Sequence, residues 1–264
     1  MTYLSRIRIN PHREKGRLLL ANPRTMHGAV MHAIPDDPAG ERILWRLDAD
    51  NPHRPFLFVL TKSKPDWSHL VEQAGWPEAD GEHAAVRDYA PLLAQIAAGR
   101  EFAFRLTANP VQNTSNPIKP SEIQAKQTAD GRQRSYRIGH RTAAQQLTWF
   151  LTRTERWGFD VPEARTDPPA RGLEPEEGPD IPSAREVRIT ARNRLSFKKK
   201  GDDKKPVILH TATFEGRLRI TDPVVFTERL LGGIGPAKSY GCGLLTLAPL
   251  QAHTLNEHRA TGNR

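Results

Sequence analysis

The order of structural elements constrains the fold of this chain most, because one six-element pattern occurs twice along it. In the first half the pattern is strand, helix, strand, strand, helix, strand. Apolar residues at every second position indicate the first strand, and Asn22 before Pro23 is a typical helix start. The expected elements are Thr2–Ile9, Asn22–Ile34, Ile43–Leu47, Phe56–Leu60, Asp66–Leu70 and Ala85–Tyr89.

The second half repeats this order, although the two halves share negligible sequence identity. Its expected elements are Phe102–Thr107, Thr142–Trp157, Arg185–Phe197, Val207–Ile220, Pro223–Leu231 and Gly243–Ala248. The repeated order is that of the ferredoxin-like fold. We therefore predict an α+β protein with two tandem ferredoxin-like (RRM-like) domains, each an antiparallel sheet with helices on one face. We expect the domains at residues 1–98 and 99–250, followed by a polar tail at 251–264.

Two segments lie outside this plan. Asn109–Gly139 is polar and basic, with little apolar periodicity, and is predicted to be a mobile loop. Asp160–Ser183 is rich in proline and acidic residues, which is typical of an exposed, partly disordered insertion.

Charge and cysteine content restrict the class of partner and the compartment. The formal net charge of +9 favours a polyanionic partner, nucleic acid before an anionic membrane surface. One cysteine excludes an internal disulfide framework and a cysteine-based zinc site, and we interpret Cys242 as a small buried side chain. No apolar run reaches the length of a membrane span, so we expect a cytoplasmic protein.

A glycine-rich stretch at 232–243 resembles a phosphate loop but is not a Walker A motif. Ala237 stands where that motif needs glycine before Lys238-Ser239, and the stretch follows a helix instead of opening one. Its backbone N–H groups and the Lys238 ammonium are suited to a polyanion. The alternative interpretation is a glycine helix cap followed by a tight turn.

The segment from Arg185 to Thr213 is predicted to form a basic hairpin with one apolar and one cationic face. The apolar side chains expected on one face are Val187, Ile189, Ala191, Leu195 and Phe197, and the cations expected on the other are Arg188, Arg192, Arg194 and Lys198. The turn has Gly201-Asp202 at its tip and carries Lys198, Lys199, Lys200, Lys204 and Lys205. Lysines alone would fit an edge hairpin protected against aggregation. The arginines favour contact with phosphates, for which a double-stranded RNA stem is the expected source.

His27 lies in the first turns of the first helix, where the helix dipole is expected to lower its pKa and favour a neighbouring phosphate. A histidine that exchanges a proton near neutral pH can activate the 2′-hydroxyl of RNA, and neither a metal nor a cofactor is then required. His32 is five residues further on, about 140° around the helix. The alternative is that both are ordinary helix residues.

Four groups of residues together resemble the CasE family, the CRISPR-repeat endoribonuclease of the type I-E Cascade complex. They are Tyr3-Leu4-Ser5, Asn22-Pro23 with Met26-His27, Phe104 to Pro110, and Phe214 to Leu218 followed by Gly233 to Leu245. The resemblance spans nearly the whole chain in order, and the glycine-rich stretch with its following strand is its most specific part.

The resemblance implies that His27 is the catalytic residue of a metal-independent cleavage at the 3′ base of the repeat stem-loop. The 2′-hydroxyl would attack, leaving a 2′,3′-cyclic phosphate or 3′-phosphate and a 5′-hydroxyl. Some family members carry a tyrosine three residues before this histidine, whereas this chain has Arg24. Arg24 and His32 are therefore the candidates for the second catalytic group. Lys238 and Ser239 are added to the hairpin cations as candidate RNA contacts.

The implied partners are the precursor CRISPR RNA repeat stem-loop, the mature crRNA and other Cascade subunits, with no membrane and a monomer when free. A rival interpretation is a non-catalytic RNA stem-loop binding subunit on the same fold, and a third is a purely structural subunit of a ribonucleoprotein. The aromatic RNP1 pattern of a single-strand-binding RRM is absent from the sequence.

Overall fold

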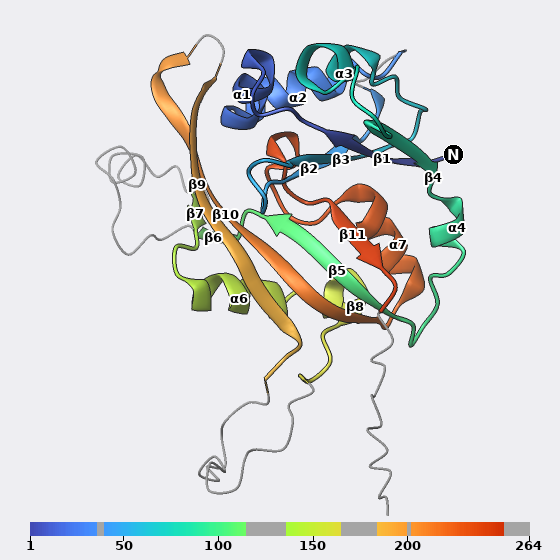
Figure 1. The fold of residues 1–264 in the computed structure, drawn as a ribbon. Helices are drawn as coiled ribbons and strands as arrows, with labels where there is room; N and C mark the ends of the chain where they lie inside the picture. The colour runs from blue at the N-terminus through green and yellow to red at the C-terminus, as the bar shows by residue number, and fades with distance from the viewer. Residues whose placement is uncertain (36–39, 115–135, 165–183, 200–201, 251–264) are drawn as a thin grey trace, which may run out of the picture.

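The computed structural model describes residues 1–35, 40–114, 136–164, 184–199 and 202–250. Two antiparallel sheets, each with helices on one face, account for most of them (Figure 1). No helix among these residues is long and apolar enough to cross a membrane.

The first sheet is built from the N-terminal part of the chain and has the order β2-β3-β1-β4. Its strands are β1 (Tyr3–Arg8), β2 (Leu44–Asp48), β3 (Phe56–Thr61) and β4 (Ala84–Asp88). Its helices, which cover the upper face in Figure 1, are α1 (Glu14–Ala21), α2 (Pro23–Met31) and α3 (Ser68–Ala74). A short α4 (Ala90–Leu93) leads to the second sheet.

The second sheet has the order β11-β5-β10, and both β9 and β8 pair with β10. Its strands are β5 (Glu101–Ala108), β8 (Phe159–Asp160), β9 (Val187–Lys199), β10 (Asp202–Ile220) and β11 (Leu245–Ala248). Its helical elements are α6 (Ala143–Leu151), η2 (Glu155–Trp157), α7 (Pro223–Gly232) and η3 (Lys238–Tyr240). A separate two-stranded ribbon joins β6 (Val111–Thr114) to β7 (Tyr136–Gly139).

Both sheets follow the predicted plan. In each, the first and third strands of the unit are central, the second and fourth lie at the edges, and the neighbours are antiparallel. This is the ferredoxin-like arrangement, so the predicted α+β class with two such units is confirmed.

Two apolar clusters form the core, and one of them spans both units. One cluster fills the space between α1, α2, α3 and the first sheet. The other begins around Phe104, Phe150 and Phe214 in the second unit and includes Leu44 and Leu60 from the first sheet. The second cluster therefore joins the two sheets, and α2 itself packs against the second unit through η3 and β9.

Several elements differ from the sequence-based predictions. The structure contains α1, which was not predicted because Leu18, Leu19 and Leu20 are consecutive and no side chain caps its start. The segment predicted as a loop at Asn109–Gly139 begins and ends in the paired strands β6 and β7. The helix predicted to reach Trp157 ends at Leu151 and is followed by η2.

The hairpin turn also differs, because Asp202 pairs with Lys199 and is the first residue of β10 instead of the turn tip. Asp160 belongs to β8 and pairs with Arg219, so the acidic insertion begins later than predicted. Most of that insertion, the centre of the basic loop and the predicted polar tail lie outside the described residues.

Candidate RNA-cleavage site and RNA-binding surface

Helix α2 carries the predicted catalytic histidine, and its start is fixed as the sequence indicated. The side chain of Asn22 accepts hydrogen bonds from the backbone N–H groups of Arg24 at 2.9 Å and Thr25 at 3.4 Å, and Pro23 occupies the first turn. The helix packs against η3 of the glycine-rich stretch and against β9 of the hairpin. The three motifs that the sequence singled out therefore meet beside α2.

The ring of His27 is half-buried. Its Nδ1 is buried without a hydrogen-bond partner among the described residues, which leaves Nε2 as the accessible nitrogen. Burial lowers the pKa of His27 below its ordinary value, because desolvation disfavours the imidazolium. The cause differs from the helix dipole that we expected, since His27 lies beyond the first turn, where that effect is concentrated. A neutral ring can accept a proton at pH 7.

The two candidates for the second catalytic group occupy opposite ends of α2. Arg24 lies in the first turn, next to the N-cap, and its side chain is partly exposed. His32 is the C-cap residue and is exposed. His32 is about 7.5 Å further along the helix axis than His27, whereas Arg24 is about one turn before His27. The role of each residue remains a prediction.

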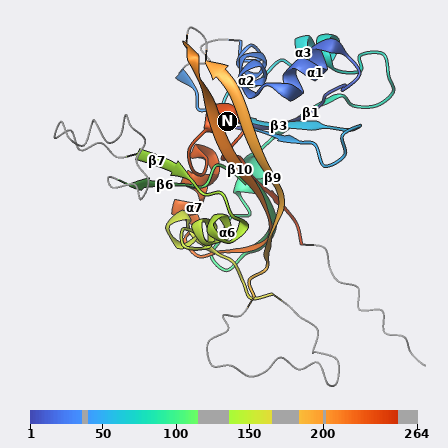
Figure 2. The same ribbon diagram turned by 90° about the vertical axis from the view of Figure 1, so that its left-hand side faces the viewer.

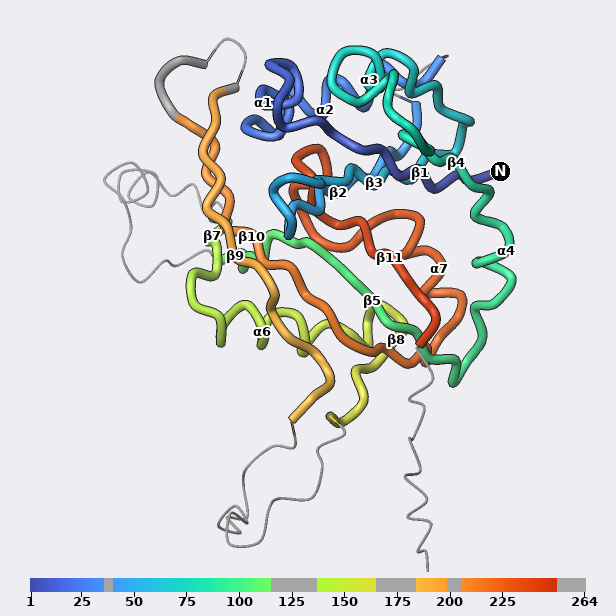
Figure 3. The backbone as a smooth tube through the Cα atoms, in the orientation of Figure 1, coloured from blue at the N-terminus to red at the C-terminus, as the bar shows by residue number. Residues whose placement is uncertain are grey.

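The glycine-rich stretch runs from the end of α7 to η3, which contacts α2 and β2, and then returns into β11 (Figure 3). Gly233 caps α7 with a φ of 79° and donates its N–H to the carbonyl of Arg229, so the helix-cap interpretation is confirmed. The glycines also make room for Lys238. A Cβ at Gly233 would lie 2.8 Å from Lys238 Cε, and one at Gly243 would lie 3.3 Å from Lys238 Cγ. The stretch therefore both ends a helix and holds a lysine.

Lys238 is a half-buried cation without a carboxylate partner among the described residues. Burial lowers its pKa, and the nearby guanidinium groups of Arg42 and Arg229 lower it further. An anion placed beside Lys238 would relieve this repulsion. Ser239 is exposed on the same turn, so both predicted contact residues of this stretch lie on η3.

Replacing Gly241 by alanine tests whether this stretch needs its backbone conformation. Gly241 has a φ of 80°, and a Cβ there would lie 2.7 Å from Cζ3 of Trp45. We expect Gly241→Ala to lower the free energy of unfolding by about 1–3 kcal/mol. Urea unfolding measures this change. Gly232→Ala is the matched control, because nothing lies within 4 Å of its Cβ, and a similar loss there would contradict the argument.

The basic hairpin of β9 and β10 rises from the level of α6 to the level of α2 (Figure 2). A register shift between Thr213 and Phe214 places one extra residue, Thr190, on β9. A bulge of this kind reverses which residues share a face. The predicted single cationic face is therefore wrong for Arg188, which is paired opposite Glu215, while Arg192 is paired opposite Ala212 on the other face.

The face of the hairpin next to α6 carries the remaining predicted arginines. Arg192 donates from Nε to Oε1 of Gln146 at 2.8 Å and also bonds the carbonyl of Arg141. Arg194 is exposed, and its guanidinium has no partner among the described residues. It is paired opposite His210, whose pKa is lowered by burial and by the charges of Arg141 and Arg194. This face is therefore strongly positive.

The opposite face of the hairpin packs toward α2 and η3. The ring of Phe197 lies 4.7 Å from that of Tyr240, between ring centroids. Leu195 and Thr211 line a cavity of about 120 Å³ with Met26 of α2. The hairpin thus packs against α2 with this side. Arg194 points to the other side, where it is exposed, and Arg192 is bound there to Gln146 and the carbonyl of Arg141.

The predicted lysines lie at the far end of the hairpin. Lys198 is exposed near the end of β9. Lys199 belongs to β9, and Lys204 and Lys205 belong to β10. Lys200 lies outside the described residues.

Cys242, as expected, is fully buried, and burial raises the pKa of its thiol to about 12, which suits a packing role.

Comparison with known proteins supplies the family. The family model described as CRISPR associated protein matches residues 2–249. The chain belongs to this family. A curated relative, the CRISPR-associated endoribonuclease Cse3 of Thermus thermophilus, is 30% identical over 250 residues, covering 94% of this chain and 100% of the relative. The Cascade subunit CasE of Escherichia coli is 28% identical over 210 residues, covering 78% and 89%.

Solved structures of the family agree with the fold. Thermus thermophilus Cse3 bound to an RNA representing a pre-cleavage complex matches with a TM-score of 0.67 and 27% identity, covering 94% of this chain and 99% of that chain. Cse3 bound to a 19 nt RNA matches with a TM-score of 0.65 and 28% identity, with coverage of 94% and 99%. The resemblance to the CasE family noted in the sequence is therefore confirmed.

Proposed function

We propose that this protein is a metal-independent endoribonuclease that cuts precursor CRISPR RNA at the 3′ base of the repeat stem-loop. The observation that carries the proposal is the position of His27. Its half-buried ring lies on a helix that packs against both the loop of Lys238 and the basic hairpin. The relatives named as endoribonucleases, one of them with a pre-cleavage RNA, support the same activity.

The proposed reaction needs only side chains and the RNA itself. Neutral His27 accepts the proton of the 2′-hydroxyl, and the 2′-oxygen attacks the adjacent phosphorus. The bond from phosphorus to the 5′-oxygen breaks, which yields a 2′,3′-cyclic phosphate and, after the 5′-oxygen gains a proton, a 5′-hydroxyl. Proximity supplies much of the rate, because the nucleophile is tethered. Arg24 or His32 would assist as the second group, and Lys238 would stabilise phosphate charge.

In this proposal, the hairpin holds the stem of the RNA, and the protein retains its product. Arg194 is exposed on β9 and would pair with a phosphate of the stem, and Arg192, which bonds Gln146 on the same face, would add a second contact. The mature crRNA with its bound nuclease would then enter the Cascade complex, consistent with the relative named as a Cascade subunit. Free protein is proposed to be a monomer.

The double variant Arg192→Gln with Arg194→Gln tests the stem contact. We expect RNA affinity to fall by about tenfold or more at low salt, and the salt dependence of log K to weaken by about two units. Fluorescence anisotropy with a labelled repeat stem-loop measures both quantities. The control is Arg87→Gln with Arg100→Gln, which removes the same charge from exposed sites on β4 and before β5. Unchanged affinity would identify the hairpin as a protected edge that does not bind phosphate.

A further inference from the structure

A positive hollow lies on the side of the hairpin that carries Arg194 and His210. It has a volume of about 660 Å³ and is bounded by β6, β7, α6, η2, α7 and the glycine-rich stretch. Its polar walls come from Arg137, Arg153, Arg156 and Arg229. No carboxylate is among its described lining residues. Four guanidinium groups around one hollow without an acid repel each other, so they favour an anion.

The arginines are partly fixed in place. Arg153 donates to the carbonyl of Trp149 at 3.0 Å and lies over the Trp149 ring, and Arg156 lies over the ring of Trp157. These contacts orient the guanidinium groups without neutralising them. The guanidinium groups of Arg137 and Arg229 have no partner among the described residues. The charge in the hollow is therefore available to a ligand.

Neighbouring groups report the same positive field. Besides burial, the charge of Arg153 lowers the pKa of His140, and the charge of Arg156 lowers the pKa of Arg153. Burial and the charge of Arg42 lower the pKa of Lys238, and the charge of Arg229 lowers it further. The hollow is therefore linked electrostatically to the lysine that η3 holds beside α2.

The hollow also connects with the hairpin. A smaller hollow of about 320 Å³ lies between His210 on β10 and the ribbon of β6 and β7. The two hollows share Val111, Arg137 and Pro236. Together they form a path from the positive face of the hairpin to the four arginines, with the glycine-rich stretch as one wall.

We infer that this arginine-lined hollow binds the phosphates of a single-stranded RNA segment adjoining the stem. This inference rests on the proposed function. Cavities of roughly 300–1,000 Å³ enclose a small molecule, so this one has room for a nucleotide or two and none for a duplex. A strand that leaves the cleavage site beside α2 would pass Lys238 and the glycine-rich stretch before it reaches Arg229. The hollow would thereby fix the direction of the RNA outside the stem.

The test compares three labelled RNAs by fluorescence anisotropy on protein carrying His27→Ala, so that no RNA is cut. The RNAs are the stem-loop alone, and the stem-loop with a single-stranded extension on its 5′ side or on its 3′ side. We expect one extension to raise the affinity. We expect this gain in affinity to be about tenfold or more, and adding Arg156→Gln with Arg229→Gln should abolish it. The same pair should reduce the slope of log K against log salt for the extended RNA by about 1.4.

The affinity of the Arg156→Gln, Arg229→Gln variant for the stem-loop alone should stay within about twofold of the parent's, because the stem contacts lie on the hairpin. The control pair Arg87→Gln with Arg100→Gln should leave the affinity for the stem-loop and for the extended RNAs unchanged. Equal binding of all RNAs by the parent, an unchanged gain in the variant, or an equal loss for the stem-loop alone would each overturn the inference. Failure of the parent to bind any of the RNAs would overturn the proposed function as well, which separates the two outcomes.

Discussion

Replacing His27 by alanine is expected to lower the rate of RNA cleavage by about 10²–10⁴-fold and to leave RNA affinity within about twofold. The reason is that the ring supplies proton transfer at the 2′-hydroxyl, whereas binding depends on the hairpin arginines and Lys238. Single-turnover cleavage and anisotropy of the repeat stem-loop measure the two effects separately. His53→Ala is the matched control, because His53 is exposed in the turn between β2 and β3.

The pH dependence of kcat/KM gives a second measurement of the same residue. A general base must be neutral in the free enzyme, so the rate should rise with pH through the pKa of His27 and then level off. Since burial lowers this pKa, the midpoint should lie below the ordinary value of 6.5. A midpoint above that value, or equal loss of cleavage and binding in His27→Ala, would contradict the assignment.

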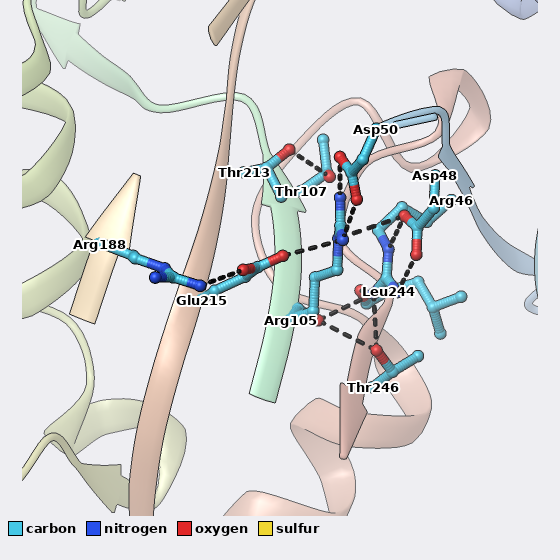
Figure 4. Close-up of polar contacts among 10 residues, drawn as sticks. All are labelled: Arg46, Asp48, Asp50, Arg105, Thr107, Arg188, Thr213, Glu215, Leu244 and Thr246. Atoms are coloured by element: carbon cyan, nitrogen blue, oxygen red, sulfur yellow. Dashed lines mark hydrogen bonds and ion pairs between the residues drawn. The ribbon is translucent and has the colours of Figure 1, made fainter. Parts of the chain in front are cut away.

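Replacing Arg46 by methionine is expected to lower the free energy of unfolding by about 3–5 kcal/mol, the largest stability effect that we predict. Arg46 is only 2% exposed and joins the two units (Figure 4). Its Nη1 donates to the carbonyls of Arg105 at 2.8 Å and Leu244 at 3.2 Å, and to Oγ1 of Thr246 at 2.8 Å. Its Nε pairs with Asp48 at 2.7 Å. Methionine would remove the guanidinium donors from these acceptors, which lie in the interior between the two units.

The network around Arg46 explains why the loss should be large. Arg105 of β5 pairs with Asp50 at 2.5 Å and with Glu215 at 2.8 Å, and its Nε lies 3.4 Å from Asp48. Glu215 also contacts Arg188, whose guanidinium approaches to 3.4 Å. Asp48 therefore lies between Arg46 of the first unit and Arg105 of the second. Loss of Arg46 removes one of its two cations and also the hydrogen bonds to the second unit.

Urea unfolding checks this prediction. Arg46→Lys keeps the charge but loses the forked geometry, so it should fall between wild type and Arg46→Met. Arg87→Met is the exposed control, since Arg87 pairs with Glu82 at the surface and should cost about 0.5 kcal/mol or less. A loss of only about 0.5 kcal/mol for Arg46→Met would contradict the prediction and show that the two units are held together by apolar packing alone.

The sequence predicted the arrangement of the sheets well because apolar alternation and helix caps are local signals. Asn22 before Pro23 was predicted to start a helix, and its side chain caps α2; Asp222 caps α7 before Pro223 in the same way. The register of the hairpin was a different case. The bulge at Thr190 depends on pairing with β10, so the residue pattern of β9 alone placed Arg188 on the wrong face.

Only the part of the candidate site that rests on local signals could be predicted from the sequence. His27 and Lys238 were recognised from motif residues, and the structure brings their elements together through the contact of α2 with η3. The roles of Arg46 and Arg229 could not be predicted, because each depends on neighbours far along the chain. Arg46 meets Leu244 and Thr246, and Arg229 meets Arg137 only across a hollow.

The most direct test of the central claim is cleavage by the wild-type protein in EDTA of two versions of the repeat stem-loop. One is all RNA, and the other carries a single 2′-deoxy sugar at the scissile position. We predict that both bind equally and that only the first is cut, at the 3′ base of the stem, leaving a 2′,3′-cyclic phosphate and a 5′-hydroxyl. Cleavage of the 2′-deoxy substrate, or tight binding of the RNA without cleavage, would contradict the proposed reaction; the second result would favour a non-catalytic stem-loop binding subunit.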